Sequence, residues 1–251
     1  MKTNTIRTNV HCLEHGDSLV QVTSWPRLFP ISQYVVRDTD GLTLVDVGIG
    51  HRGVAAVQAL AQEWQQPVVR IVLTHAHIDH VGGLDAHVAA FPDAEVAASA
   101  RTIDYLRGDL TLTPEEARIS VDLPGAFPTM RTRPSRILTP GDRFGALEVI
   151  DAAGHTPDSI AFMDTRTDTL LVGDAFQTQG DVAVAGVVVP EFPVPGRKTW
   201  YRPMALEAAR RMLALYPARL ASGHGPVLVR PRNAMQRAIN TAEARFATLA
   251  D

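Results

Sequence analysis

Residues 68–74, Val-Val-Arg-Ile-Val-Leu-Thr, limit the folds open to this chain more than any other segment. Such a nearly continuous run of β-branched residues suits a strand that is buried on both faces of a sheet. The chain then reads His75, Ala76, His77, Ile78, Asp79, His80. A dense histidine motif therefore begins where this buried strand is predicted to stop.

Short apolar strands alternate with amphipathic helices along the rest of the chain. Antiparallel strands are predicted at residues 33–36 and 42–46, and Asp40-Gly41 between them favours a tight reversal. The remaining predicted strands are 95–98, 147–152, 159–164, 169–172 and 219–222, and the predicted helices are 52–65, 81–91, 100–107, 204–216 and a last one from 233. Strands followed by helices in each half indicate two αβ halves that face each other across their sheets.

Residues 108–135 contain Pro114, Pro124, Pro128 and Pro134, so a broken or loop-like region is predicted there, with one helical stretch at 114–120. Long excursions of this kind often form lids or walls of a substrate pocket.

The chain has 251 residues, of which 45% are hydrophobic and 20% are charged. This composition supports one large core or two closely joined halves, and we interpret residues 1–251 as a single domain. A net charge of −3 argues against a nucleic-acid partner. Residues 1–16 contain no apolar core of signal-peptide length, and the longest apolar run, 182–190, is too short to cross a bilayer. We therefore expect a cytoplasmic protein with no membrane partner.

Cys12 is the only cysteine, which excludes an internal disulfide and any thiolate-rich metal site. A bound metal must therefore be held by nitrogen and oxygen, and Cys12 is expected to be a small packed residue.

Five of the nine histidines follow one dispersed pattern that also includes aspartates. Side chains alternate along an extended segment, so His75 and His77 can point to the same side and bind one ion. Asp79 and His80 can then turn toward a second ion. Further along the chain, the residues that stand beside glycine just past a predicted strand are His155, Asp174 and His224.

The other histidines, His11, His15, His51 and His87, have no such context. We expect them to be structural or exposed, with His87 on the outer side of a helix.

The motifs resemble those of the metallo-β-lactamase superfamily over nearly the full chain. They are Leu44-Val45-Asp46-Val47-Gly48, Thr74-His75-Ala76-His77-Ile78-Asp79-His80, Gly154-His155-Thr156-Pro157, Gly173-Asp174 and Gly223-His224-Gly225. The resemblance implies an α/β (α+β) fold, a four-layer αββα sandwich with metals at one edge of its two sheets.

The same resemblance implies a set of metal ligands. His75, His77 and His155 would hold the first ion, Asp79, His80 and His224 the second, and Asp174 both. Asp46 would lie behind the site and orient a ligand. Its alternative is a strand-end carboxylate that caps a turn.

The implied activity is that of a dinuclear metal-dependent hydrolase, with a metal-bridging hydroxide that attacks carboxylic esters or lactones. Asp79 and Asp174 are the catalytic candidates, and Asp174 could also help protonate the leaving group. Two divalent metal ions are expected. Zinc suits nitrogen and oxygen ligands, and manganese, iron, cobalt and nickel are alternatives. Alternative activities are thioester or phosphodiester hydrolysis and an iron-dependent oxidoreductase similar to persulfide dioxygenases.

Departures from the family pattern indicate which branch of the superfamily the chain resembles most. No cysteine ligand is present, which favours the lactonase and glyoxalase II-like branch over true β-lactamases. The glyoxalase II-like thioesterases add a helical C-terminal domain that binds glutathione; only one helix is predicted after His224, so a glutathione thioester is a disfavoured substrate. Gln177 stands where the best-known lactonases have a tyrosine. Asp158 replaces a frequent glycine and is expected to keep a left-handed turn.

A small-molecule substrate is the expected partner, and these residues leave its identity, the metal and the oligomeric state open. Residues 176–201 are predicted to line the substrate pocket and to face the broken region 108–133. Its candidate residues are Phe176, Gln177, Phe192, Trp200 and Tyr201, with Tyr201 a possible replacement for the missing tyrosine. The alternative is that these aromatic residues pin the loop to the core.

Overall fold

The computed structural model describes residues 3–6, 10–120 and 122–248. They form two compact units, which we call the first unit (Met1–Gly108 and Phe127–Leu138) and the second unit (Asp109–Ala126 and Thr139–Asp251). Among the described residues, no helix combines the length and the apolar character that a bilayer crossing requires.

The first unit is built on an eight-stranded sheet whose strands follow one another in chain order. They are β1 (Thr3–Ile6), β2 (Val10–Glu14), β3 (Leu19–Ser24), β4 (Ile31–Arg37), β5 (Leu42–Val45), β6 (Val68–Val72), β7 (Glu95–Ala98) and β8 (Arg136–Ile137). Neighbours from β1 to β5 are antiparallel, and those from β5 to β8 are parallel. The parallel part needs crossover connections, which contain α1 (Val54–Trp64), α2 (Ile78–Val81), α3 (Leu84–Ala90) and α4 (Ala100–Leu106).

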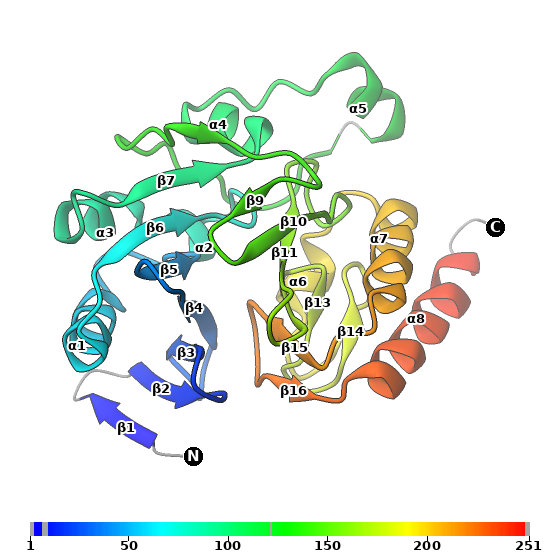
Figure 1. Cartoon of the computed structure of the whole chain (residues 1–251). Coiled ribbons are helices and arrows are strands. Elements are labelled where there is room, and N and C mark those ends of the chain that lie inside the picture. The colour runs from blue at the N-terminus through cyan, green and yellow to red at the C-terminus, as the bar shows by residue number, and fades with distance from the viewer. Residues whose placement is uncertain (1–2, 7–9, 121, 249–251) are drawn as a thin grey trace. The chain divides into compact units, whose positions relative to one another are not determined.

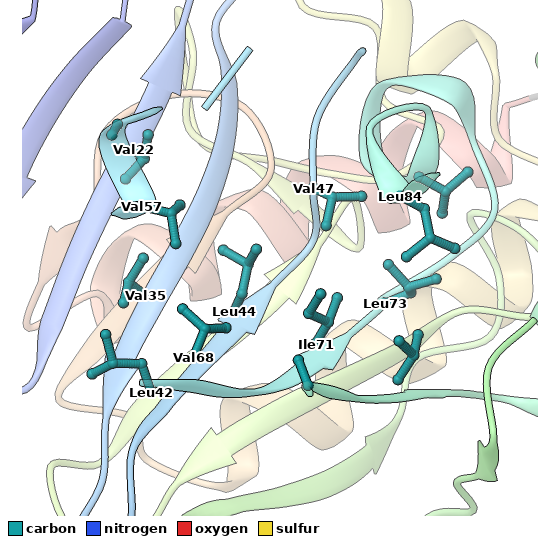
Figure 2. Packing of buried hydrophobic residues seen from close by; sticks show 14 of the residues in the cluster. Val22, Val35, Leu42, Leu44, Val47, Val57, Val68, Ile71, Leu73 and Leu84 are labelled. Atoms are coloured by element: carbon teal, nitrogen blue, oxygen red, sulfur yellow. The ribbon is translucent and has the colours of Figure 1, made fainter. Parts of the chain in front are cut away.

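Helices and strands of the first unit share one apolar cluster. Figure 2 shows Val57 of α1 beside Val22 and Val35, which come from two neighbouring strands. Leu84 of α3 belongs to the same cluster, near Leu73, which directly follows β6. Burial of these side chains fixes the ends of the parallel strands, where the histidine motif begins.

The second unit contains a six-stranded sheet in the order β16-β15-β12-β11-β10-β9 and a small β13-β14 ribbon. The strands are β9 (Arg143–Phe144), β10 (Leu147–Asp151), β11 (Ile160–Asp164), β12 (Thr169–Gly173), β13 (Phe176–Gln177), β14 (Ala183–Val184), β15 (Arg219–Ser222) and β16 (Leu228–Val229). Of these pairings, only β12 with β15 is parallel. The helices are α5 (Pro114–Ile119), α6 (Val194–Arg197), α7 (Arg202–Ala214) and α8 (Arg232–Ala247).

Two long helices pack against one side of this second sheet. Figure 1 shows α7 and α8 next to each other, and both contribute buried side chains to one cluster with the strands. Met212 of α7 and Met235 of α8 are fully buried there, together with Leu170 of β12 and Leu220 of β15. The core is therefore assembled from the buried faces of two amphipathic helices.

The predicted strand at 68–74, the hairpin around Asp40-Gly41 and the helix at 114–120 are confirmed as β6, β4-β5 and α5. α5 has no buried residue; Thr113 and Glu116 form a capping box at its start, which satisfies the first backbone N–H groups of the helix.

Three sequence predictions are wrong. The helix expected at 81–91 is two helices, because Gly82 and Gly83 separate α2 from α3. His87 is fully buried rather than on the outer side of its helix, and its ring contacts the carbonyl oxygen of Gly83. Asp158 is buried and does not adopt a left-handed backbone, so this position does not imitate the glycine of the family.

Candidate metal centre

The histidine motif lies at the carboxyl ends of β5 and β6. These two strands are parallel neighbours, so the residues that follow them emerge at the same edge of the sheet. Asp46 follows β5, and His75 and His77 follow β6. A backbone hydrogen bond of 2.8 Å from Val47 N to His80 O then ties the two connections together.

Three imidazole rings of this motif are buried, and those of His77 and His80 both lie close to that of His75. Nε2 of His75 lies 3.2 Å from Nδ1 of His77, and the ring centroids of His75 and His80 are 4.1 Å apart. Asp79, in the first turn of α2, is half-buried. The first unit therefore presents four candidate ligands on one short segment.

Asp46 holds two of these histidines in defined tautomers. Its Oδ2 accepts hydrogen bonds of 2.8 Å from His80 Nδ1 and from Thr74 Oγ1, and its Oδ1 accepts one of 2.8 Å from Thr74 N. Because the Thr74 hydroxyl donates to Asp46, it accepts from His75 Nδ1 at 3.1 Å. Both Nδ1 atoms thus carry hydrogen, which leaves the Nε2 atoms of His75 and His80 as candidate metal donors.

The second unit presents its candidate ligands at the ends of three strands that run in the same direction. His155 follows β10, Asp174 follows β12, and His224 follows β15. A backbone hydrogen bond of 2.8 Å from Gly223 N to Gly173 O joins the ends of β12 and β15. All three candidate side chains are buried.

One carboxylate oxygen of Asp174 is shared between the two histidines. Oδ2 of Asp174 lies 3.4 Å from Nε2 of His155 and 3.3 Å from Nε2 of His224. Charge-assisted hydrogen bonds are shorter, about 2.7–2.9 Å. Two ligand atoms of one tetrahedral zinc ion, each about 2.0–2.1 Å from the metal, lie about 3.3 Å apart. The spacings around Asp174, and the 3.2 Å between His75 Nε2 and His77 Nδ1, match this distance between two ligand atoms of one ion.

Glycine is required beside both histidines of the second unit. A Cβ at Gly154 would lie 2.3 Å from the backbone nitrogen of Ala205, and one at Gly225 would lie 2.3 Å from that of Gln179. Both glycines also have positive φ angles, which disfavour other residues. The glycines that flank the ligands in the sequence are therefore demanded by close backbone packing.

Two phenylalanine rings lie against candidate ligands. Phe127 stands 4.8 Å from the ring centroid of His77 and 5.1 Å from that of Tyr105, all in the first unit. Phe192 stands 5.1 Å from the ring centroid of His224 in the second unit. Phe192 is one of the residues predicted from the sequence, whereas Phe127 is not, because it follows Gly125 and Ala126 in the broken region and carries no local signal.

The other predicted pocket residues have different surroundings. Phe176 is packed in the apolar core of the second unit. Gln177 is buried, and its amide donates to the carbonyl oxygens of Gln179 and Phe192. Trp200 is buried, while Tyr201 is half-buried and precedes the first turn of α7.

The donor chemistry of the described candidates fits divalent metal ions. Imidazole nitrogens and carboxylate oxygens suit zinc and other first-row metals. Cys12 is buried among the apolar residues of the first unit, and burial raises its thiol pKa to about 11, so it stays a neutral packed residue.

The family model described as the metallo-beta-lactamase superfamily matches residues 26–224, a span that contains all seven candidate ligands. The chain belongs to the metallo-β-lactamase superfamily. Its members are metal-dependent hydrolases in the main, and two relatives from Bacillus subtilis (strain 168) carry the name "Probable metallo-hydrolase". YflN is 24% identical over 72% of this chain and 74% of its own length, and YybB is 27% identical over 61% and 65%.

A third relative, "Uncharacterized protein YobT" of the same Bacillus strain, is 39% identical over 89% of this chain and 95% of its own length. Among solved structures, a metallo-beta-lactamase from Pontibacter korlensis matches with a TM-score of 0.68 at 17% identity, over 93% of this chain and 99% of that one. The predicted α/β fold of the metallo-β-lactamase type is therefore confirmed.

Proposed function

We propose that this metallo-β-lactamase superfamily member binds two divalent ions, preferably zinc, and hydrolyses carboxylic esters, with lactones or simple esters as the substrate class. The observation that carries the proposal is the position of Asp174 Oδ2, 3.4 Å from one histidine nitrogen and 3.3 Å from another. A single oxygen with this spacing to two histidine nitrogens fits an aspartate that two ions would share.

The ligands would divide as the family motifs imply. His75, His77 and His155 would hold one ion, and Asp79, His80 and His224 the other, with Asp174 common to both. When bound, such ions lower the pKa of a coordinated water and polarise the carbonyl oxygen of the substrate.

The side chains of the chain supply orientation and proton transfer. Asp46 and Thr74 hold His75 and His80 in the tautomers that leave Nε2 available. The Oδ2 atom of Asp174 faces the two histidines, and we assign its other oxygen, Oδ1, the role of taking a proton from the attacking water and passing it to the departing alkoxide, which leaves as the alcohol. Asp79, which is half-buried, is the second proposed catalytic carboxylate.

The aromatic rings beside the ligands favour an ester over a phosphodiester. Phe127 lies against His77, and Phe192 lies against His224. Apolar surfaces suit an acyl or lactone ring and give no electrostatic attraction to a polyanion. The net charge of −3 supports a small, uncharged substrate for the same reason.

The test begins with metal analysis of protein purified without added metal. We expect about two ions per chain. The protein is then assayed with lactone, ester, thioester, β-lactam and phosphodiester substrates, with and without a chelator. Lactone or ester hydrolysis should be the fastest activity and should be lost with chelator and in His77→Ala.

The matched control is His51→Ala, which removes an exposed histidine and should keep full activity. Fewer than one metal ion per chain, or hydrolysis unaffected by His77→Ala, would contradict the proposal. If thioesters or phosphodiesters are cleaved faster than esters and lactones, the proposed substrate class is wrong. If the protein binds iron and catalyses a redox reaction, the proposed hydrolysis is wrong.

A further inference from the structure

The segment after α6 is fastened to the loop that carries His155. Trp200 N donates to His155 O at 2.8 Å, and Tyr201 N donates to Gly154 O at 3.0 Å. All of these residues belong to the second unit. The side chain of Thr199 is thereby placed beside the imidazole ring of His155.

The hydroxyl group of Thr199 has one hydrogen, and its acceptor can be identified. Thr199 Oγ1 lies 2.9 Å from the carbonyl oxygen of Pro195, which only accepts hydrogen bonds. The Thr199 hydrogen therefore points to Pro195. A lone pair of Oγ1 remains for Nδ1 of His155, 3.2 Å away, and that nitrogen must donate.

This arrangement leaves Nε2 of His155 without hydrogen in the neutral ring. Nε2 is the atom that lies 3.4 Å from Asp174 Oδ2, the proposed shared ligand. The same logic operates in the first unit, where the Thr74 hydroxyl donates to Asp46 and accepts from His75 Nδ1. There the threonine is adjacent to its histidine, whereas Thr199 is separated from His155 by 44 positions.

We propose that Thr199 is a positioning residue that holds His155 in the tautomer with Nε2 available to the metal. The segment that follows α6 is thereby coupled to metal affinity. This inference rests on the proposed function, because it assigns His155 as a ligand. Loss of such an outer hydrogen-bond partner lowers metal affinity by about 10- to 100-fold in comparable sites.

The first experiment is long-range proton–nitrogen NMR of the metal-free protein near pH 8, which reports the ring nitrogen that carries hydrogen. We expect hydrogen on Nδ1 of His155 in the wild type and in Thr199→Ser. Thr199→Val has nearly the same shape but no hydroxyl, and it should give a mixture of tautomers or hydrogen on Nε2. Unchanged tautomers in Thr199→Val would overturn the proposal.

The second experiment measures zinc affinity by competition with a chelator, together with the absorption spectrum of the cobalt-substituted protein. Thr199→Val should bind zinc about 10- to 100-fold more weakly and should show an altered cobalt spectrum, whereas Thr199→Ser should stay close to the wild type. The control is Thr241→Val, which changes an exposed threonine of α8 in the same unit and should leave both readouts unchanged.

The outcomes separate this inference from the proposed function. If the wild type binds no metal, the proposed function fails and the role of Thr199 with it. If the wild type binds metal and Thr199→Val binds it equally well, only the role of Thr199 fails. Equal losses in Thr199→Val and Thr199→Ser, with equal drops in the melting temperature of the metal-free protein, would show a packing role and overturn the inference.

Discussion

Asp46 and His80 form a buried pair in which the carboxylate Oδ2 lies 2.8 Å from the imidazole Nδ1. The backbone of Asp46 has a φ angle of +57°, a left-handed conformation that aspartate tolerates better than most residues. Through Thr74, the same carboxylate also orients His75. Asp46, the residue after β5, thus orients two candidate ligands, His75 and His80, that come after β6.

Asp46→Asn should weaken metal binding without unfolding the protein. Asparagine keeps the size of the side chain, but its amide group cannot accept hydrogen bonds at both ends from Thr74 and His80. We expect zinc affinity to fall by about 10- to 100-fold, measured by chelator competition. Asp93→Asn, at an exposed aspartate, is the control. Wild-type affinity in Asp46→Asn would show that the carboxylate serves only the turn.

The candidate ligands could be predicted from the sequence because they come within a few residues after the ends of strands, or in the short helix α2 that follows β6. Parallel neighbours end at one edge, so a motif after β6 and an aspartate after β5 must be close. The glycines Gly154 and Gly225 mark two of these positions in the sequence, because tight backbone packing leaves no room for a side chain there.

Contacts between distant loops carried no such signal. Thr199 reaches His155 across 44 positions, and Phe127 reaches His77 from the far end of the broken region. His87 is buried although the sequence predicts an outer position, because the prediction assumes one helical period over 81–91, whereas α3 is a separate helix that begins at Leu84. Local pattern therefore identifies candidate ligands, whereas the residues that contact them from distant loops leave no local pattern.

Phe127→Ala should change substrate preference more than metal binding. The ring lies 4.8 Å from the His77 ring, so its removal takes away apolar surface beside a proposed ligand. We expect KM for esters with long acyl chains to rise about tenfold, which corresponds to about 1.4 kcal/mol of lost apolar contact, with little change for acetyl esters. Phe127→Leu should restore most of the preference. Equal effects on short and long acyl chains would contradict a role in acyl binding.

His87 should make the protein less stable in mild acid. Burial lowers the pKa of His87 to about 4, against an ordinary value of 6.5, and the hydrogen bond to Gly83 O only partly opposes this shift. Below pH 6.5, His87 takes up a proton in the unfolded chain but stays neutral in the folded chain. The free energy of unfolding therefore falls as the pH drops toward 4. At pH 5 this loss amounts to about 2 kcal/mol.

The measurement is the free energy of unfolding in urea at pH 7.5 and pH 5. His87→Asn keeps a side-chain N–H but does not titrate in this range, so its stability should fall by about 2 kcal/mol less than that of the wild type between the two pH values. His51→Asn, at an exposed histidine, should retain the wild-type difference. A parallel fall in wild type and His87→Asn would refute the assignment.

Asp85 should anchor the segment Phe127–Leu138, the second stretch of chain in the first unit. Burial by itself raises the pKa of Asp85, but hydrogen bonds from Thr132 and Arg131 outweigh it, and the pKa falls to about 2 from 3.8. The contacts are 2.7 Å from Thr132 N to Oδ1 and 3.2 Å from Arg131 N to Oδ2. Because the folded pKa is the lower one, this stabilisation is present above pH 3.8 and is lost as the pH falls toward 2.

Asp85→Asn should therefore lower the free energy of unfolding by about 1–2 kcal/mol at pH 7 and by much less near pH 2. Hydrogen exchange should accelerate at the amides of Arg131 and Thr132, whose acceptor is weakened. Asp17→Asn, at an exposed aspartate, should change neither quantity. If the amides of both residues keep their protection in Asp85→Asn, the carboxylate does not anchor the segment. Its contacts with α4, such as the hydrogen bond from Met130 N to Leu106 O, would then hold it in place.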